Sequence, residues 1–417
     1  MSELTTMGNR AREAARLLRV ASDGAKSSAL RSIAQALIEH TDEILAANAK
    51  DLSAARETGM SQSMLDRLAL SRDRIQGMAD GVEAVADWPD PVGHIQEEYT
   101  LPNGILVRKV SVPLGVVGII FESRPNVTSD CAALCIRAGN ACILRGGKEA
   151  FQSNSKITEI MRNALAVTDI PEDAVQLVMD TDRRSAKELM EMTGYIDVLI
   201  PRGGAGLIRS VVDNAKVPVI ETGAGNCHIY VDKAANIEMA ADIVVNAKTS
   251  RPSVCNAAEH LLVHRDIAEE ALPVIASRLR EKDVELHVDA AAGAILRGGS
   301  DVLPATDADW GTEYIALTMG IKIVDSLEEA VDHIERWSTH HSDCIVTDDQ
   351  EAADRFLAGV DSAAVYHNAS TRFTDGGEMG LGAEIGISTQ KLHARGPMGV
   401  NQLVTYKYTL CGNGQIR

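Results

Sequence analysis

The sequence is poor in aromatic residues, which make up 3% of its 417 positions, although 45% of the residues are hydrophobic. Aliphatic side chains must therefore fill its cores. Basic residues are also in deficit, because 41 lysines and arginines face 59 aspartates and glutamates and leave a net charge of −18. A general nucleic-acid surface needs a basic footprint, so this balance argues against one. Any anionic ligand has to be held by a local cluster of cations.

Paired cysteines and long apolar runs are absent as well. The seven cysteines are scattered, odd in number and form no C-x-x-C pair, a spacing that suits neither a zinc site nor a disulfide framework. No apolar run approaches the ~18 residues of a membrane span, and residues 1–20 lack the apolar stretch of a signal peptide. We therefore expect a cytoplasmic protein without a metal or a membrane partner.

The length of the chain predicts two or three domains. Residues 8 to about 90 show the periodicity of helices. The spacing of three and four residues places one apolar set on a single helix face: Leu30, Ile33, Ala34, Leu37 and Ile38. Two prolines, Pro89 and Pro91, forbid continuation of the helices beyond this point.

A β-hairpin follows, because Asn103-Gly104 lies between two alternating apolar runs. Residues 401–410 alternate in the same way at the end of the chain. We expect residues 98–112 and 401–417 to form a small β-element whose open edge accepts a second subunit, giving a homo-oligomer.

From residue 113 the pattern becomes strand, loop, helix. Short apolar runs typical of buried strands occupy residues 116–121, 141–144, 175–179, 198–200 and 217–220. This series predicts an α/β protein with a parallel sheet covered by helices. We expect a Rossmann-type cofactor domain over residues 1–225, interrupted by the hairpin, and a second α/β domain over residues 226–400 with strands at 260–263, 321–324 and 344–346.

Two glycine-rich loops follow strands of the first domain, and ligands of such sheets bind at the carboxyl ends of the strands. One loop contains Arg145 and Lys148, and the other contains Gly203, Gly204 and Gly206. Glycines let backbone N–H groups approach a phosphate at a helix N-terminus. Neither loop has the strict G-x-G-x-x-G pattern, so simple turn glycines explain them equally well.

Cys255 is the strongest candidate nucleophile of the chain. Polar and cationic residues surround it in the segment from Asn246 to Asn256, as a thiolate of low pKa requires. The alternative is an inert packing cysteine, which is the commoner role of cysteine in proteins.

Several motifs together resemble the aldehyde dehydrogenase superfamily along essentially the whole chain. They are Pro113-Leu-Gly-Val-Val-Gly118, Ser123-Arg-Pro-Asn126, Gly139-Asn140, Glu221-Thr-Gly-Ala-Gly-Asn226, Ser250-Arg-Pro-Ser-Val-Cys255 and Gly412-Asn-Gly-Gln-Ile-Arg417. The resemblance implies a cofactor domain, a catalytic domain and a β-element for oligomerisation. It is strongest to the members that reduce L-glutamate 5-phosphate with NADPH, in proline biosynthesis.

The resemblance also implies roles for single residues. Cys255 falls on the superfamily's nucleophile and Glu221 on its general base, whose chemical role is open in a reductase. The superfamily's oxyanion asparagine aligns at Arg124 or Glu122, depending on the direction of counting, and the nearest asparagine is Asn126. The expected mechanism forms a thioester on Cys255, which accepts hydride and yields glutamate 5-semialdehyde.

Ligand-binding residues follow from the same comparison. Arg145 and Lys148 take the places of the superfamily's ribose-binding Lys-Pro-x-Glu motif, and cations there favour NADP(H) over NAD. Glu313 is similar to the acid that holds the nicotinamide ribose. Arg124 and Arg251 both stand in Ser-Arg-Pro triplets and are the expected substrate anion ligands, with Arg202 and Arg395 behind them.

The sequence leaves three hypotheses about the function. One is the reductase, with a transient partner in glutamate 5-kinase, because acyl phosphates hydrolyse readily. Another is an NAD-dependent dehydrogenase of a different semialdehyde, and the third is a non-catalytic nucleotide-binding or scaffold protein with an inert Cys255.

Overall fold

The computed structural model describes residues 2–296 and 301–417, which form two compact units. The first unit comprises Met1–Thr222, Gly380–Gly386 and Met398–Arg417, and the second comprises Gly223–Met379 and Ile387–Pro397. The first break falls three residues before the predicted 225/226 boundary. The assignment of residues 226–400 to one domain differs at two short segments, because the chain returns to the first unit at Gly380–Gly386 and again at Met398.

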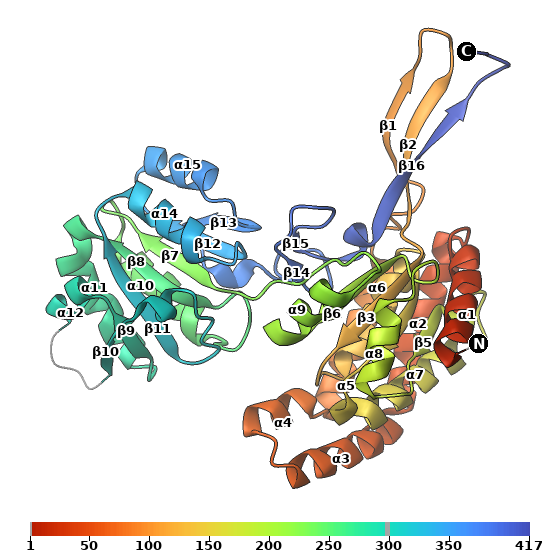
Figure 1. Cartoon of the computed structure of the whole chain (residues 1–417), viewed down its shortest axis with the longest axis horizontal. Helices are drawn as coiled ribbons and strands as arrows, with labels where there is room; N and C mark the ends of the chain where they lie inside the picture. Colours follow the sequence, from red (N-terminus) through yellow and green to blue (C-terminus); the bar gives the residue numbers. More distant parts are fainter. Residues whose placement is uncertain (1, 297–300) are drawn as a thin grey trace. The chain divides into compact units, whose positions relative to one another are not determined.

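Helices α1 to α5 open the first unit, as the periodicity predicts (Figure 1). Their bounds are α1 Glu3–Leu18, α2 Asp23–Glu39, α3 Thr41–Glu57, α4 Gln62–Leu68 and α5 Arg72–Asp87. The Ser22 side chain caps α2 by accepting a hydrogen bond from the Ala25 N–H. Leu30, Ile33 and Leu37 are buried, but the prediction is wrong for Ile38, which lies at the margin of the apolar face and is 39% exposed. Helix α5 ends just before the two prolines.

The first unit contains a parallel sheet of Rossmann type, and within the described residues its order is β5-β4-β3-β6. The strands are β3 Val116–Phe121, β4 Ala141–Arg145, β5 Val175–Leu177 and β6 Val198–Arg202, and the helices between and after them are α6 Asn126–Arg137, α7 Phe151–Leu165, α8 Arg183–Met190 and α9 Ala205–Asn214. Short 3-10 turns, η1 Lys148–Ala150 and η2 Glu172–Ala174, precede α7 and β5. The predicted strand at 217–220 is only a single bridge between Leu199 and Val219, because Pro218 has no N–H to donate.

The predicted β-element is present as an antiparallel sheet of order β1-β2-β16. Its strands are β1 Ile95–Thr100, β2 Leu106–Pro113 and β16 Val404–Cys411, which the 3-10 turn η4 Val400–Leu403 precedes. Gly104 adopts a φ of +87°, which a side chain rarely permits, and thus allows the hairpin turn. Figure 1 shows β16 lying beside β2, although about 300 residues separate them in the sequence.

The second unit contains a larger parallel sheet, of order β10-β9-β11-β8-β7-β12-β13 in the described ranges. Its strands are β7 Cys227–Val231, β8 Ala258–His264, β9 Glu285–Val288, β10 Val302–Pro304, β11 Thr318–Val324, β12 Ser342–Val346 and β13 Ala364–His367. Its helices are α10 Ile237–Thr249, α11 Arg265–Arg280, α12 Ala290–Ile295, α13 Asp307–Trp310, α14 Leu327–Trp337 and α15 Gln350–Gly359, followed by η3 Thr371–Phe373 and the short strands β14 Ile387–Ser388 and β15 Gly396–Pro397.

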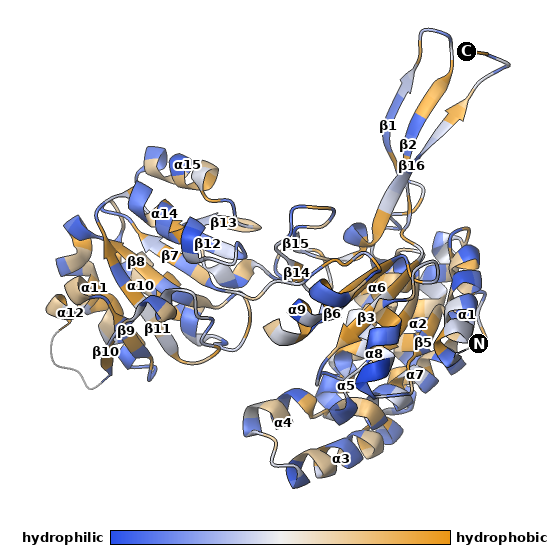
Figure 2. Cartoon of the chain, in the orientation of Figure 1, coloured by the Kyte–Doolittle hydropathy of each residue, from blue (hydrophilic) through white to orange (hydrophobic). Residues whose placement is uncertain are grey.

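Both faces of this sheet are buried, as expected of a parallel sheet. Ile229, Leu261 and Ile321 belong to an apolar core with residues of α10 and α11, whereas Tyr230 and Leu262 belong to a second core with residues of α14 and α15. Figure 2 shows hydrophobic residues running along β3 of the first unit and β8 of the second. The α/β fold class with two parallel sheets and a small β-sheet is therefore confirmed.

Two negative findings apply to the described ranges. No helix in them is long and apolar enough to cross a membrane. They also contain no group of three or more histidine, cysteine or acidic side chains placed to hold a metal ion.

Candidate active site

Cys255 lies on residues 250–257, which connect α10 to β8 and are called the cysteine loop below. Its side chain is partly exposed, whereas the other cysteines of the chain are buried, except for the exposed Cys411. The loop enters β8 and is therefore at the amino end of that strand. The carboxyl-end rule for ligands of parallel sheets applies to the loops of the first unit but does not locate this cysteine.

The Glu221–Asn226 motif meets the cysteine loop at Gly225. A Cβ atom at this position would lie 1.5 Å from the Cys255 carbonyl oxygen, so only glycine permits the contact. The same carbonyl accepts a hydrogen bond from Cys227 Sγ at 3.2 Å. The motif thus holds the backbone of the nucleophile in place.

Asn256 fixes the other side of the cysteine loop. Its side-chain amide donates to the carbonyl oxygens of Thr374 at 2.8 Å and Arg372 at 3.2 Å, and its own carbonyl accepts from Thr371 Oγ1 at 2.7 Å. The Arg372 guanidinium returns a hydrogen bond to the Asn256 side-chain oxygen. The η3 segment and the cysteine loop are therefore bound together by side chains on both sides.

A buried ion pair links the residues on either side of the cysteine loop. Lys248, in the last turn of α10, lies 2.6 Å from the Glu259 carboxylate in β8, and neither side chain is exposed to solvent. Burial raises the pKa of Glu259 to about 7 and lowers the pKa of Lys248, because each charge loses its hydration. The pair joins the two elements that carry the loop.

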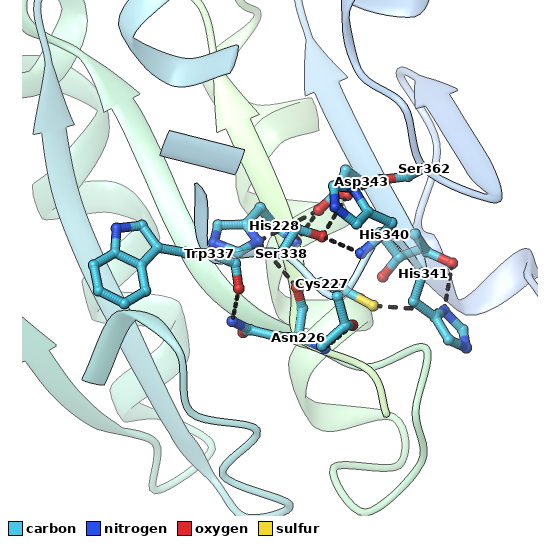
Figure 3. A network of polar contacts seen from close by, with 12 residues as sticks. Asn226, Cys227, His228, Trp337, Ser338, His340, His341, Asp343 and Ser362 are labelled. Carbon is cyan, nitrogen blue, oxygen red and sulfur yellow. Dashed lines mark hydrogen bonds and ion pairs between the residues drawn. The ribbon is translucent and has the colours of Figure 1, made fainter. Parts of the chain in front are cut away.

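A polar network supports the strands beside the loop (Figure 3). Asn226 donates to the carbonyl oxygens of Trp310 at 2.8 Å and Trp337 at 2.7 Å. Asp343 accepts from the His228 N–H at 2.7 Å and from Ser338 Oγ at 2.9 Å. This network fixes the end of the motif that contains Gly225.

Three sequence-predicted ligand residues lie in the second unit. The Glu313 carboxylate accepts the Gly225 N–H at 2.9 Å, so in this structure it anchors the motif. Arg251 is exposed on the cysteine loop. Arg395 donates to Asp361 Oδ1 at 2.7 Å, so its charge is paired with an acidic side chain.

Asn126 opens α6 in the first unit. Its amide nitrogen, the donor that an oxyanion needs, lies 2.9 Å from the Asp130 carboxylate. Burial raises the pKa of Asp130 to about 6. The oxyanion role of Asn126 stays a prediction.

Arg145 and Lys148 lie at the carboxyl end of β4. Arg145 donates to the Thr181 carbonyl at 2.9 Å, while its buried Nε atom has no hydrogen-bond partner within the described ranges. Burial lowers the pKa of Arg145. Lys148 is exposed. Two cations therefore lie at the carboxyl end of one strand, the end where ligands of parallel sheets bind.

The second glycine-rich loop, residues 203–206, already binds a carboxylate of the protein itself. The Gly204 N–H donates to the Glu122 carboxylate at 2.9 Å, and a Cβ at Gly203 would lie 2.5 Å from that carboxylate. A phosphate bound there by Gly203, Gly204 and Gly206 has to displace Glu122. The remaining predicted residues, Arg124, Arg202 and Glu221, are half-buried in the first unit.

The sequence reasoning missed Arg372, Asp130 and the Lys248–Glu259 pair. Arg372 stands 117 positions after Cys255 and belongs to none of the motifs, so nothing in the sequence connects it with the cysteine. The 11-residue spacing of Lys248 and Glu259 carries no signal, because it spans a helix end, a loop and a strand.

Comparison with known proteins gives one consistent result. Residues 2–297 match the model of the aldehyde dehydrogenase family. The chain is 55% identical to a gamma-glutamyl phosphate reductase of Moorella thermoacetica over 415 residues, which cover 100% of this chain and 99% of the relative. It is 54% identical to the reductase of Thermobifida fusca, with the same coverage.

A solved structure gives the same result. The crystal structure of gamma-glutamyl phosphate reductase from Thermotoga maritima superposes with a TM-score of 0.97 at 47% identity, covering 100% of both chains. Identity at this level along the whole length confirms the resemblance that the motifs indicate. The chain belongs to the aldehyde dehydrogenase family and, within it, to the gamma-glutamyl phosphate reductases.

Proposed function

We propose that this chain reduces L-glutamate 5-phosphate to L-glutamate 5-semialdehyde and phosphate with NADPH, the second step of proline biosynthesis from glutamate. The observation that carries the proposal is the partly exposed Cys255 on a loop held from three sides, in a chain that matches the reductases from end to end. A loop clamped in this way presents one thiol at a fixed position, which is what nucleophilic catalysis requires.

Cys255 is the proposed nucleophile. Its thiolate attacks the acyl carbon, a carbon–sulfur bond forms, the bond from that carbon to the phosphate oxygen breaks, and inorganic phosphate leaves with the electron pair. The Cys255 N–H and the Asn126 side chain are the proposed oxyanion donors, and removal of one such donor costs about 10²- to 10³-fold in rate.

A nicotinamide cofactor follows from the family, and we propose NADP(H). Arg145 and Lys148 are the proposed ligands of the 2′-phosphate on its adenosine ribose, because both are cations at the carboxyl end of β4 and Lys148 is exposed there. When bound, the cofactor supplies the hydride that reduces the thioester. Contacts from the Gly203–Gly206 loop and from Glu313 require release of the hydrogen bonds that these groups now make.

Substrate recognition needs cations in an otherwise acidic protein. Arg124 and Arg251 are the proposed ligands of the substrate anions, since an arginine can bind a carboxylate or phosphate through two hydrogen bonds. Glu221 corresponds to the base that activates water in aldehyde oxidation. Water attack on the thioester is unproductive here, so we assign Glu221 to proton handling or to structure.

Assembly and location complete the proposal. The β1-β2-β16 sheet leaves β1 and β16 at its edges, and an open edge can pair with another copy of the chain. We propose a homo-oligomer formed through this sheet, working in the cytoplasm in transient contact with glutamate 5-kinase. The contact would shorten the exposure of a labile acyl phosphate to water.

The decisive experiment is the reverse reaction. NADP⁺ reduction by glutamate 5-semialdehyde is measured with and without phosphate, and again with NAD⁺. We expect turnover that depends on phosphate and favours NADP⁺. Aldehyde oxidation that proceeds equally well without phosphate would instead identify a hydrolytic dehydrogenase and overturn the proposal.

A further inference from the structure

Arg372 places a cation directly beside the cysteine loop. Its side chain donates to Ser250 Oγ from Nε at 3.1 Å and to the Asn256 side-chain oxygen from Nη1. Ser250 and Asn256 stand five residues before and one residue after Cys255. The guanidinium therefore spans the loop that carries the nucleophile.

The backbone of Arg372 is as firmly held as its side chain. The Arg372 and Thr374 carbonyls both accept from Asn256, and Ser370 caps the η3 turn by accepting the Arg372 N–H. A long side chain that is fixed at both ends loses little further freedom when a ligand arrives, so its hydrogen bonds contribute more to binding.

Charges of both signs lie around Arg372, and Arg251 is a second cation among them. Burial and the neighbouring Arg251 both lower the pKa of Arg372, whereas Asp375, Cys255 and Glu378 raise it. Two arginines near one thiol repel each other, and a dianion between them would relieve that repulsion. Planar guanidinium groups bind phosphate oxygens through paired N–H donors.

We propose that Arg372, acting with Arg251, binds the phosphate group of the acyl phosphate and receives inorganic phosphate as it leaves Cys255. The proposal rests on the reductase activity proposed above and names a residue for its leaving group. As the thiolate adds to the acyl carbon, the electron pair of the breaking carbon–oxygen bond moves onto the phosphate. Arg372 stabilises that growing charge through charge-assisted hydrogen bonds.

The test compares R372Q and R372K with the unmodified enzyme. R372Q should raise the KM for phosphate in the reverse reaction by about 10- to 100-fold, the usual effect of losing a hydrogen bond to a charged group. The KM for NADP⁺ should change less than about twofold. The KM of R372K for phosphate should lie between those of R372Q and the unmodified enzyme, because a lysine keeps the charge but lacks the paired donors.

A second readout does not depend on turnover. Iodoacetamide should alkylate the partly exposed Cys255, and inorganic phosphate bound at Arg372 should slow that reaction in the unmodified protein but not in R372Q. S250A is the matched control, because it removes one hydrogen bond that holds Arg372 but keeps the cation, so phosphate should still protect it, although less than the unmodified protein. R355Q removes a surface arginine that pairs with Glu328 and should change nothing.

The outcomes separate this inference from the function on which it rests. If the unmodified enzyme shows no phosphate-dependent turnover, the proposed function itself is wrong. If that turnover is present and folded R372Q keeps its KM for phosphate, Arg372 is not a phosphate ligand. If R372Q slows alkylation equally with and without phosphate, Arg372 only activates the thiol. Should R372Q fail to fold, the phosphate KM of R372K decides.

Discussion

We propose that the reaction requires Cys255 but not the carboxylate of Glu221, and single substitutions test this difference. Cys255→Ser should abolish reduction, because a serine hydroxyl at neutral pH is a far weaker nucleophile than a thiolate. Glu221→Gln should keep much of the reductase rate, since no water has to be activated. Both effects are measured in the reverse direction, with semialdehyde, phosphate and NADP⁺, because the same thioester forms in both directions. Cys411→Ser on β16 is the control. An inactive but folded Glu221→Gln variant would show that the carboxylate takes part in the chemistry.

Gly225 tests the contact between the motif and the nucleophile. A Cβ at this position would lie 2.6 Å from the Cys255 Cα and closer still to its carbonyl, and backbone atoms cannot move aside as side chains do. Gly225→Ala should therefore displace the loop and lower kcat by about 100-fold, the scale of a 1 Å misplacement.

Gly77→Ala in α5 is the matched control, because among the described residues its Cβ would meet no atom within 4 Å apart from the adjoining backbone of its own helix. This change should leave kcat intact and stabilise the helix by about 0.5–1 kcal/mol. Equal kcat values for the two variants would contradict the assigned role of Gly225.

At the scale of elements, the Lys248–Glu259 pair joins α10 to β8. Glu259→Gln leaves a buried lysine without a counter-charge and should cost about 3–5 kcal/mol of the free energy of unfolding. Replacing both residues, as K248M with E259L, removes both charges and should recover most of that loss.

Urea unfolding of the single and double variants measures these effects. Lys322→Met breaks the partly exposed pair with Glu329 and should cost less than about 1 kcal/mol. If the double variant is as unstable as Glu259→Gln, the cost comes from lost packing and not from an unpaired charge.

A histidine cluster between the sheet and its helices should make stability sensitive to acid. The ring centroids of His228 and His260 are 4.8 Å apart, and those of His228 and His333 are 5.5 Å apart. Burial lowers the pKa of His333 to about 3, with smaller effects from His228, Lys322 and Arg336, and it also lowers the pKa of His260.

Because these pKa values fall on folding, the unfolded chain binds protons first as the pH drops. The stabilisation is complete above about pH 6.5 and is lost progressively toward pH 3, by up to about 1.4 kcal/mol per histidine and pH unit. Urea unfolding between pH 7 and pH 4 should therefore show a shallower pH dependence for His333→Leu. An unchanged slope would indicate that His333 does not control the acid response.

For the whole molecule, the β1-β2-β16 sheet is the proposed assembly surface. Tyr408 and Leu410 are 52% and 59% exposed on β16. Replacing both with lysine places charge on an edge strand and should reduce the oligomer to smaller species, because charged edges resist pairing with another copy. Light scattering after size-exclusion chromatography measures the mass. The control is Val20→Lys, which adds a charge on the exposed turn after α1.

Local patterns in the sequence determine much of this protein. The helical periodicity, the Asn103-Gly104 hairpin and the runs at 116–121 and 141–144 predict elements that the structure contains, because each depends on the spacing of apolar residues or on a turn residue. The motif around Cys255 identifies the family for the same reason, since it is a contiguous stretch.

The tertiary structure decides what lies next to that stretch. Gly225, Lys248, Glu259 and Arg372 meet the cysteine loop from a motif, a helix, a strand and a 3-10 turn. The tertiary structure also gives predicted ligand-binding groups other partners. Glu313 accepts the Gly225 N–H, and the Gly204 N–H donates to Glu122. Hydrogen bonds and charge pairs between distant segments depend on how the sheet order brings strands together, and the periodicity of a single segment contains no record of that order.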